Sequence, residues 1–201
     1  MNTTQNWVIA SNNKGKIEEI NNLFKPYNII LKSQSEYNVQ EVPETATTFI
    51  ENALIKARHA CEQTNLPSLA DDSGLVVPSL NGEPGLYSAR YSGTNNDQDN
   101  IQKLLTKLTP QANKIIPAYL YCIIVLLRHK LDPSPIIAEG IWHGEITMIP
   151  KGTNGFGYNP IFFDPKYNLT AAQMTLEQKE AVSHRGQALR KLLEIWQNDL
   201  L

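Results

Sequence analysis

Short apolar runs and helical repeats of apolar residues follow one another along this chain. The runs predict β-strands at residues 7–10, 29–31, 118–127, 136–142 and 161–163. Apolar residues at helical spacing predict four helices, with these apolar positions: Ile17, Ile20, Leu23 and Phe24; Phe49, Ala53, Ala57 and Ala60; Ile101, Leu104, Leu105 and Leu108; Leu189, Leu192, Leu193 and Trp196. A further helix is expected to begin after Thr175, because Thr175 and Gln178 fit a capping box.

The stretch Leu69–Leu75 places two adjacent carboxylates between apolar runs. It predicts a strand, a tight turn that carries Asp71 and Asp72, and a second strand. Because successive residues of an extended chain point to opposite faces, the two aspartates should not share a role. A carboxylate at the end of a strand suits Mg²⁺, which takes oxygen ligands. The alternative is an ordinary Asp-Asp-Ser-Gly turn held by local hydrogen bonds.

A polar loop, Ser11–Lys16, separates the first predicted strand from the first predicted helix. Strand, loop and helix in this order present backbone N–H groups to phosphate. Lys14 and Lys16 at the start of the helix oppose its dipole, at a cost of about 0.3–1 kcal/mol each, and a bound polyanion would reverse that sign. Two solvated lysines are the alternative. The Gly-Lys-Ser/Thr ending of a Walker loop is absent.

The segment Pro150–Pro160 places an aromatic pair among three glycines, just before a predicted strand. Glycines let a backbone approach a ligand closely, and a loop phenylalanine such as Phe156 can stack on a flat base. Alternatively, Phe156 fills the core of a glycine-rich hairpin. Glu44 comes just before a predicted helix, where a carboxylate is usually no more than a favourable charge.

Composition narrows the class of protein. Of the 201 residues, 41% are hydrophobic and 19% are charged, which is typical of a globular chain. The formal net charge of −2 provides no basic field for nucleic acid or for a membrane surface. We expect no signal peptide and no membrane span, because the apolar blocks are too short. Cys61 and Cys122 have no metal-binding spacing and are expected to be buried, reduced thiols of a cytoplasmic protein.

Five stretches in order, with compatible spacing, resemble the inosine triphosphate pyrophosphatase family, also called Ham1-like. They are residues 11–16, 44–57, 70–91, 154–158 and 183–185, and the likeness runs from residue 7 to residue 193. The resemblance implies one α/β domain over residues 1–201, with two lobes around a long twisted mixed β-sheet and a cleft between them. It also implies a homodimer that uses Mg²⁺ to hydrolyse non-standard purine nucleoside triphosphates (ITP, dITP and XTP) to the monophosphate and pyrophosphate.

The resemblance carries over to single residues. Asp72 would be the general base and a metal ligand, and Glu44 a second metal ligand. The phosphates would be held by Ser11, Asn12, Asn13, Lys14, Gly15, Lys16, Lys56 and Ser73. The base and the remainder of the nucleotide would be framed by Phe156, Gly157, Tyr158, Asn159, Lys179, His184 and Arg185. Two positions depart from the family pattern, because Ala46 stands where glycine is usual and Asn159 where aspartate is usual.

Two other functions stay open on the sequence. A sister pyrophosphatase for modified pyrimidine triphosphates would share the phosphate chemistry and differ at the base pocket. The Phe156 loop and the donors His184 and Arg185 favour an oxo-purine, whose 6-position accepts hydrogen bonds. The other is a non-catalytic nucleotide- or RNA-binding module. The balanced charge opposes RNA binding, and the presence of both Glu44 and Asp72 opposes a non-catalytic role.

Overall fold

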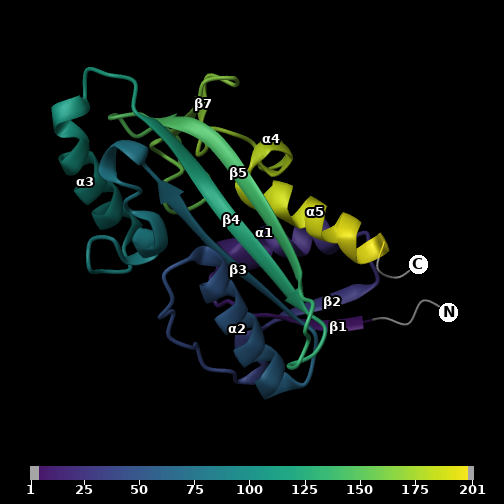
Figure 1. The fold of residues 1–201 in the computed structure, drawn as a ribbon. Helices are drawn as coiled ribbons and strands as arrows, with labels where there is room; N and C mark the ends of the chain where they lie inside the picture. Colours follow the sequence, from purple (N-terminus) through teal and green to yellow (C-terminus); the bar gives the residue numbers. More distant parts are fainter. Residues whose placement is uncertain (1–4, 199–201) are drawn as a thin grey trace. The chain divides into compact units, whose positions relative to one another are not determined.

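The computed structural model describes residues 5–198 (Figure 1). The chain divides into two compact units. Within the described residues, unit 1 takes the chain up to Asp72, then Cys122–Gly140, and the chain from Arg185 onward. Unit 2 takes Ser73–Tyr121 and Ile141–His184. Each unit is therefore assembled from segments that are distant in the sequence.

The strands of the described residues are β1 (Gln5–Ile9), β2 (Ile29–Ser33), β3 (Ser68–Val76), β4 (Pro117–Leu127), β5 (Ile136–Ile146), β6 (Phe162–Asp164) and β7 (Leu169–Thr170). They are hydrogen-bonded in the order β2-β1-β3-β4-β5-β6-β7. β1 is parallel to β2 and to β3, whereas β6 is antiparallel to β5 and to β7. The predicted α/β class with a mixed sheet is confirmed. β3, β4 and β5 contribute residues to both units.

The α-helices are α1 (Lys14–Phe24), α2 (Phe49–Thr64), α3 (Asp97–Leu108), α4 (Leu176–Val182) and α5 (His184–Asn198). Short 3₁₀ helices cover Gln34–Tyr37, Pro78–Leu80, Gly85–Arg90 and Thr109–Gln111. The first four α-helices begin at side chains that accept a backbone N–H of the first turn, namely Asn13, Thr48, Asn96 and Thr175. The capping box predicted at Thr175 and Gln178 is confirmed.

Alternation along β1 and β3 builds the core of unit 1. Trp7 and Leu69 face the apolar stripes of α1 and α5, which include Phe24 and Leu189. The Trp7 ring meets Phe24 edge-on, with ring centroids 5.7 Å apart. On the opposite face of β3, the Ser68 hydroxyl donates to a backbone carbonyl of α2 at 2.6 Å. Helices therefore cover both faces of these strands.

The core of unit 2 gathers apolar residues of α3, β5 and β6 in one cluster. Leu104 and Leu108 of α3 are fully buried in one cluster with Trp142 and Phe162. The Trp142 Nε1–H donates to the buried carboxylate of Asp164 at 2.7 Å, which satisfies both polar groups. A full burial of each large apolar side chain contributes about 1.5–3 kcal/mol, so the apolar stripe of α3 fixes the helix firmly.

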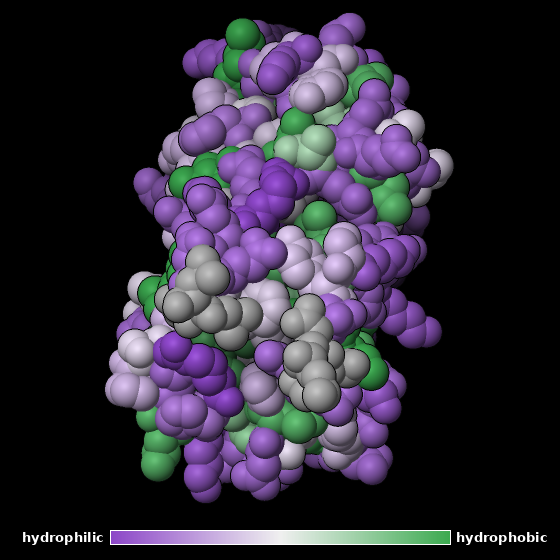
Figure 2. All heavy atoms as spheres, turned by 90° about the vertical axis from the view of Figure 1, so that its right-hand side faces the viewer, coloured by the Kyte–Doolittle hydropathy of each residue, from purple (hydrophilic) through white to green (hydrophobic). Residues whose placement is uncertain are grey.

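Hydrophilic side chains predominate on the face drawn in Figure 2, and hydrophobic ones are scattered over it. Within residues 5–198, no helix has the length and apolar character required to cross a lipid bilayer.

Candidate active site

Asp71 and Asp72 lie inside one unbroken strand, β3, so the predicted tight turn between two strands is wrong. A Cβ on Gly74 would overlap the carbonyl oxygen of Gly85, so this glycine serves a close approach of two backbone segments. The two carboxylates point to opposite faces, as predicted. Asp72 meets α2, whereas Asp71 meets α1 and α5. Ser73 follows on the strand and is half-buried.

Asp72 and Glu44 share one cationic partner. The Nζ of Lys56, on α2, lies 2.9 Å from Asp72 Oδ1 and 2.7 Å from Glu44 Oε1. It also donates to the backbone carbonyl of Asp71 at 2.7 Å. The side chains of Lys56, Asp72 and Glu44 are 14%, 10% and 23% exposed, so the cluster is shielded yet reached by solvent. Two carboxylates from distant segments therefore converge on a single positive charge.

The surroundings of Asp72 make its carboxylate a better proton acceptor than that of an ordinary aspartate. Burial raises the pKa of Asp72, Lys56 offsets part of this rise, and Glu44 adds to it. Burial acts to lower the pKa of Lys56, but Asp72, Asp71 and Glu44 outweigh it and raise that pKa. Lys56 therefore stays charged, while Asp72 is a stronger base than an ordinary aspartate.

Hydrogen bonds at the start of α2 position the segment that carries Glu44. The buried side chain of Asn52 accepts the backbone N–H of Ala46 at 3.0 Å. Asn52 and Lys56 share a face of the helix, so this face holds both the preceding loop and the acidic pair. Ala46 is not among the described residues with a positive φ. The departure from glycine at this position therefore demands no unusual backbone.

Asp71 is the centre of a buried ionic network. Its Oδ1 lies 2.7 Å from Lys16 Nζ, and its Oδ2 accepts from Arg185 Nε and Nη2 at 3.1 and 3.0 Å. Cys122 Sγ lies 3.6 Å from the same oxygen, and Arg185 pairs with Glu19 through Nη1. Burial acts to raise the pKa of Asp71, but Lys16 and then Arg185 hold it below its ordinary value. Asp71 therefore ties α1 and α5 to β3.

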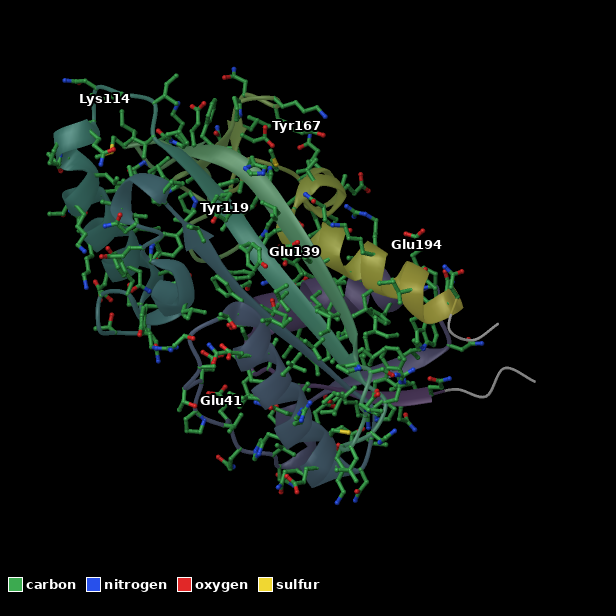
Figure 3. All side chains as sticks on the ribbon, viewed as in Figure 1. Glu41, Lys114, Tyr119, Glu139, Tyr167 and Glu194 are labelled. Carbon is green, nitrogen blue, oxygen red and sulfur yellow. The ribbon has the colours of Figure 1, made fainter. Side chains whose placement is uncertain are left out.

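The predicted phosphate loop is held by its own side chains. Ser11 Oγ accepts the backbone N–H of Asn13 at 3.2 Å, and Asn13 Oδ1 accepts that of Lys16 at 3.1 Å. Asn12 donates from its amide to Glu41 at 3.0 Å, and Glu41 lies in the segment that leads to α2 (Figure 3). The loop is therefore ordered by hydrogen bonds within unit 1.

The three lysines predicted to bind phosphate, Lys14, Lys16 and Lys56, differ in exposure and in their ionic partners. Lys14, the first residue of α1, is exposed, and Gly15 separates it from Lys16. Lys16 is paired with Asp71, whereas Lys56 is paired on the other face of β3. Lys16 and Lys56 therefore bind adjacent residues of one strand from opposite sides.

The glycine-rich loop of unit 2 presents Phe156 between two glycines. Gly155 and Gly157 have φ values of +80° and +60°, which other residues rarely adopt. Phe156 is half-buried and is not a member of the described core cluster of unit 2. The Nζ of Lys179 lies 5.3 Å from the centroid of its ring. These contacts favour a stacking surface over a core plug.

The other residues predicted to frame the base are buried. Tyr158 belongs to the core of unit 2, and its hydroxyl donates to the carbonyl of Ser88 at 3.0 Å. The Asn159 amide fills the space where a Cβ on the glycine at 155 would stand. His184 and Arg185, at the start of α5, are buried as well. Tyr158 and Asn159 therefore anchor the loop, while Phe156 is its more accessible side chain.

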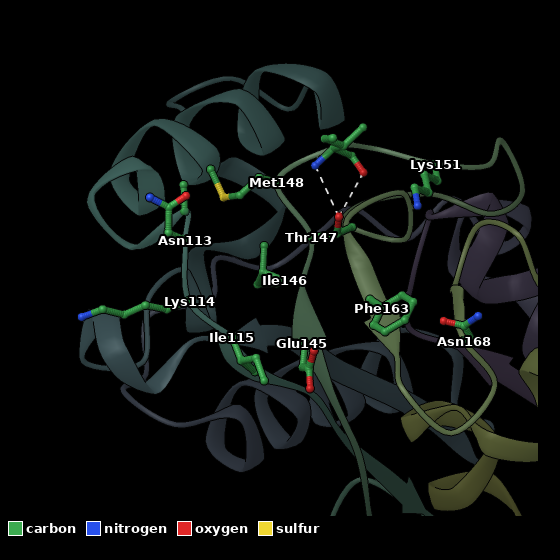
Figure 4. A pocket seen from close by; sticks show the side chains of 12 residues that line it. Asn113, Lys114, Ile115, Glu145, Ile146, Thr147, Met148, Lys151, Phe163 and Asn168 are labelled. Carbon is green, nitrogen blue, oxygen red and sulfur yellow. Dashed lines mark hydrogen bonds between the residues drawn. The ribbon is translucent and has the colours of Figure 1, made fainter.

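A surface hollow of about 610 Å³ in unit 2 is separate from the predicted site residues, none of which lines it (Figure 4). Its walls combine apolar side chains such as Ile115 and Phe163 with the charged Lys114, Glu145 and Lys151. This hollow therefore does not locate the chemistry, which follows from the charged clusters instead.

Sequence reasoning gave Asp71 no role and did not single out Glu19. Glu19 follows Lys16 by three residues, so both lie on one face of α1. This spacing indicates a charged face on the helix and could have drawn attention to Glu19. Arg185, the buried partner of Glu19, lies 166 residues away in the sequence, and no local pattern reveals this pairing.

The chain belongs to the Ham1 family, whose sequence model matches residues 7–195. The resemblance based on five stretches is thereby confirmed.

Relatives and solved structures agree with this membership. The chain is 55% identical over 186 residues to a dITP/XTP pyrophosphatase of Xylella fastidiosa (strain 9a5c), which covers 92% of this chain and 94% of that protein. It is 49% identical over 195 residues to a dITP/XTP pyrophosphatase of Escherichia coli O157:H7, with coverage of 96% and 99%. A solved HAM1 protein from Coxiella burnetii matches with a TM-score of 0.89 at 45% identity, covering 96% of this chain and 99% of that one.

Proposed function

We propose that this chain is a nucleoside-triphosphate pyrophosphatase that hydrolyses dITP, ITP and XTP to the monophosphate and pyrophosphate, and so cleanses the nucleotide pool. The family membership and the names of the close relatives support this reaction. The observation that carries it is the convergence of Glu44 and Asp72 on one positive charge. Such a pair can serve both a cation and an attacking water.

We infer that Glu44 and Asp72 hold Mg²⁺ during the reaction. The described residues contain no group of three or more His, Cys, Asp or Glu side chains that could hold a metal. Mg²⁺ needs no such cage, because one or two carboxylates, waters and substrate phosphates usually hold it. The pair therefore fits this ion, which when bound supplies positive charge to the phosphate oxygens.

Asp72 is the proposed general base. It accepts the proton of the water that attacks the α-phosphorus, and the bond from that phosphorus to the bridging oxygen breaks, so pyrophosphate leaves. The triphosphate is bound by the loop and lysines of unit 1 and by the residue that follows Asp72: Ser11, Asn12, Asn13, Lys14, Gly15, Lys16, Lys56 and Ser73.

The proposed selection for an oxo-purine rests on stacking and on hydrogen-bond donors. Phe156 stacks on the base, and Gly157, Tyr158, Asn159 and Lys179 shape its surroundings. His184 and Arg185 donate toward the 6-oxo group, and adenine would meet these donors with its own amino group. A site built for a hydrogen bond rejects a mismatched analogue by about 10⁴–10⁵. Asp71 and Glu19 each take N–H groups of the buried Arg185, so the base would have to meet those that remain.

We also propose a cytoplasmic homodimer. The family resemblance supports the dimer, and the two buried free thiols, Cys61 and Cys122, support a reducing compartment. Light scattering coupled to gel filtration measures the mass directly, and a mass of one chain at all concentrations would contradict the dimer.

A substrate panel at fixed Mg²⁺ tests the proposed function. Pyrophosphate release should be fast with dITP, ITP and XTP and slow with dATP, dGTP and dCTP, and chelation of Mg²⁺ should abolish it. Faster release from modified pyrimidine triphosphates would favour the sister enzyme. Binding of dITP without any release would favour a non-catalytic module.

A further inference from the structure

A hydrogen bond inside unit 2 joins the candidate base loop to the start of α3. Asp97 Oδ2 accepts the backbone N–H of Gly157 at 2.6 Å, across 60 residues of sequence. A carboxylate acceptor at this distance makes a charge-assisted bond, which is stronger than a bond between neutral groups. The contact involves the peptide that directly follows Phe156, so it bears on the orientation of that ring.

Asp97 is well placed to hold a loop. It is the first residue of α3, where the helix dipole favours a negative charge. Asn96 caps the helix by accepting the N–H groups of Gln98 and Asp99 at 2.8 and 3.1 Å. Further along, Leu104 is fully buried in the core of unit 2. The carboxylate therefore projects from a rigid element.

The same end of α3 also holds the segment 88–92, which contacts the loop. The buried Asn100 donates to the carbonyl of Ala89 at 3.0 Å and accepts the N–H of Ser92 at 2.7 Å. The carbonyl of Ser88, next in that segment, accepts from the Tyr158 hydroxyl at 3.0 Å. Two consecutive loop residues, at 157 and 158, are therefore secured from α3, one directly and one through the neighbouring segment.

Gly157 needs such a restraint. Its φ of +60° lies in the left-handed region, and beyond Gly157 and its two chain neighbours no heavy atom lies within 4 Å of the position where a Cβ would stand. Glycine adopts other backbone conformations at little steric cost, so local sterics do not select this one. The bond to Asp97 favours this one, because rotation of the peptide between Phe156 and Gly157 would turn the N–H away from the carboxylate. The carbonyl of the same peptide accepts the backbone N–H of Asn159 in a longer bond of 3.4 Å.

We propose that Asp97 is a positioning residue, which fixes the peptide after Phe156 and thereby presents the ring of Phe156 to the purine base. This inference rests on the proposed function and goes beyond it, since the described hydrogen bond of the Asp97 carboxylate goes to the loop after Phe156 and not to a proposed phosphate-binding residue or metal ligand. A bond that already orders the loop lowers the ordering cost of base binding. Its loss should weaken nucleotide binding while the chemical step stays unchanged.

Steady-state kinetics with dITP tests this role, with Asp97→Ala as the variant and Asp99→Ala as the matched control. Asp99 lies in the same first turn and is also exposed, but its carboxylate accepts from the Thr94 hydroxyl at 3.0 Å. We expect Asp97→Ala to raise KM for dITP about tenfold with kcat unchanged, as for loss of one hydrogen bond that acts in binding. Asp97→Asn keeps an acceptor oxygen and should restore most of the affinity.

Inhibition by pyrophosphate distinguishes a local effect on base binding from a general loss of structure, because a general loss would also weaken pyrophosphate binding. Pyrophosphate carries no purine for Phe156 to stack on. Its inhibition constant should therefore be equal in wild type, Asp97→Ala and Asp99→Ala. Equal KM values for the two alanine variants, or a parallel rise in the inhibition constant, would overturn the positioning role and leave the proposed function intact. Absence of dITP hydrolysis by the wild type would overturn the proposed function and this inference with it.

Discussion

The substitution Asp71→Asn tests whether the buried ionic network holds α1, β3 and α5 together. Asparagine keeps the shape of aspartate and removes its charge. One of its two terminal groups becomes an NH₂ donor, which cannot accept from Lys16 or from Arg185. Two buried or partly buried cations would then face a neutral side chain.

The contacts set the magnitude. Arg185 donates to Asp71 at 3.1 and 3.0 Å, and Lys16 lies 2.7 Å away. Removal of one partner of a buried pair costs about 3–5 kcal/mol of unfolding free energy. A chain of this length loses about 2–4 °C in Tm per kcal/mol, so a decrease of about 6–20 °C is expected. Because Glu19 still pairs with Arg185, the lower half of that range is the expectation.

Thermal unfolding at neutral pH, followed by circular dichroism, measures this effect. Glu41→Gln is the matched control, since it neutralises an exposed carboxylate of the same unit and should change stability by less than about 0.5 kcal/mol. Asp71 has a lowered pKa, so its stabilisation is complete above the ordinary aspartate value of about 3.9 and is lost as the pH falls below it. The wild type should therefore lose stability in acid more steeply than Asp71→Asn. Equal Tm values for Asp71→Asn and Glu41→Gln would refute the reasoning.

Two further predictions concern the proposed general base, Asp72, and the glycine-rich loop around Phe156. The carboxylate of Asp72 is the active form, so kcat/KM for dITP should fall as the pH drops through its raised pKa, above the ordinary value of about 3.9. Glu44→Gln removes a cause of that rise and should move the acid limb to lower pH; an unmoved limb would contradict the assignment. Gly155→Ala combines a φ of +80° with a clash against Asn159, so unfolding in urea should show a loss of about 1–3 kcal/mol, and wild-type stability would argue against the loop geometry.

Local patterns predicted much of the fold. The apolar stripes of α1, α3 and α5 all face the cores, and the capping box at Thr175 begins α4. Alternation was enough to send Asp71 and Asp72 to opposite faces. These features succeeded because each depends on neighbours within a few residues.

The predictions that failed, and the contacts that were not predicted, depend on residues that are far apart in the sequence. Asp-Asp-Ser-Gly has the local chemistry of a turn, yet Gly74 is needed because the carbonyl of Gly85 passes where a Cβ would stand. The network of Asp71 joins it to Arg185 across 114 residues, and Asp97 meets Gly157 across 60. Nothing in the local sequence specifies which segments meet in space.

Turnover of Asp72→Asn is the most direct test of the central claim, which is that Asp72 accepts the proton of the attacking water. Pyrophosphate release from saturating dITP would give kcat, and calorimetric titration without Mg²⁺ would give the dITP affinity. The account predicts a kcat lower by at least about a hundredfold with an affinity close to that of the wild type. A kcat near the wild-type value would contradict it.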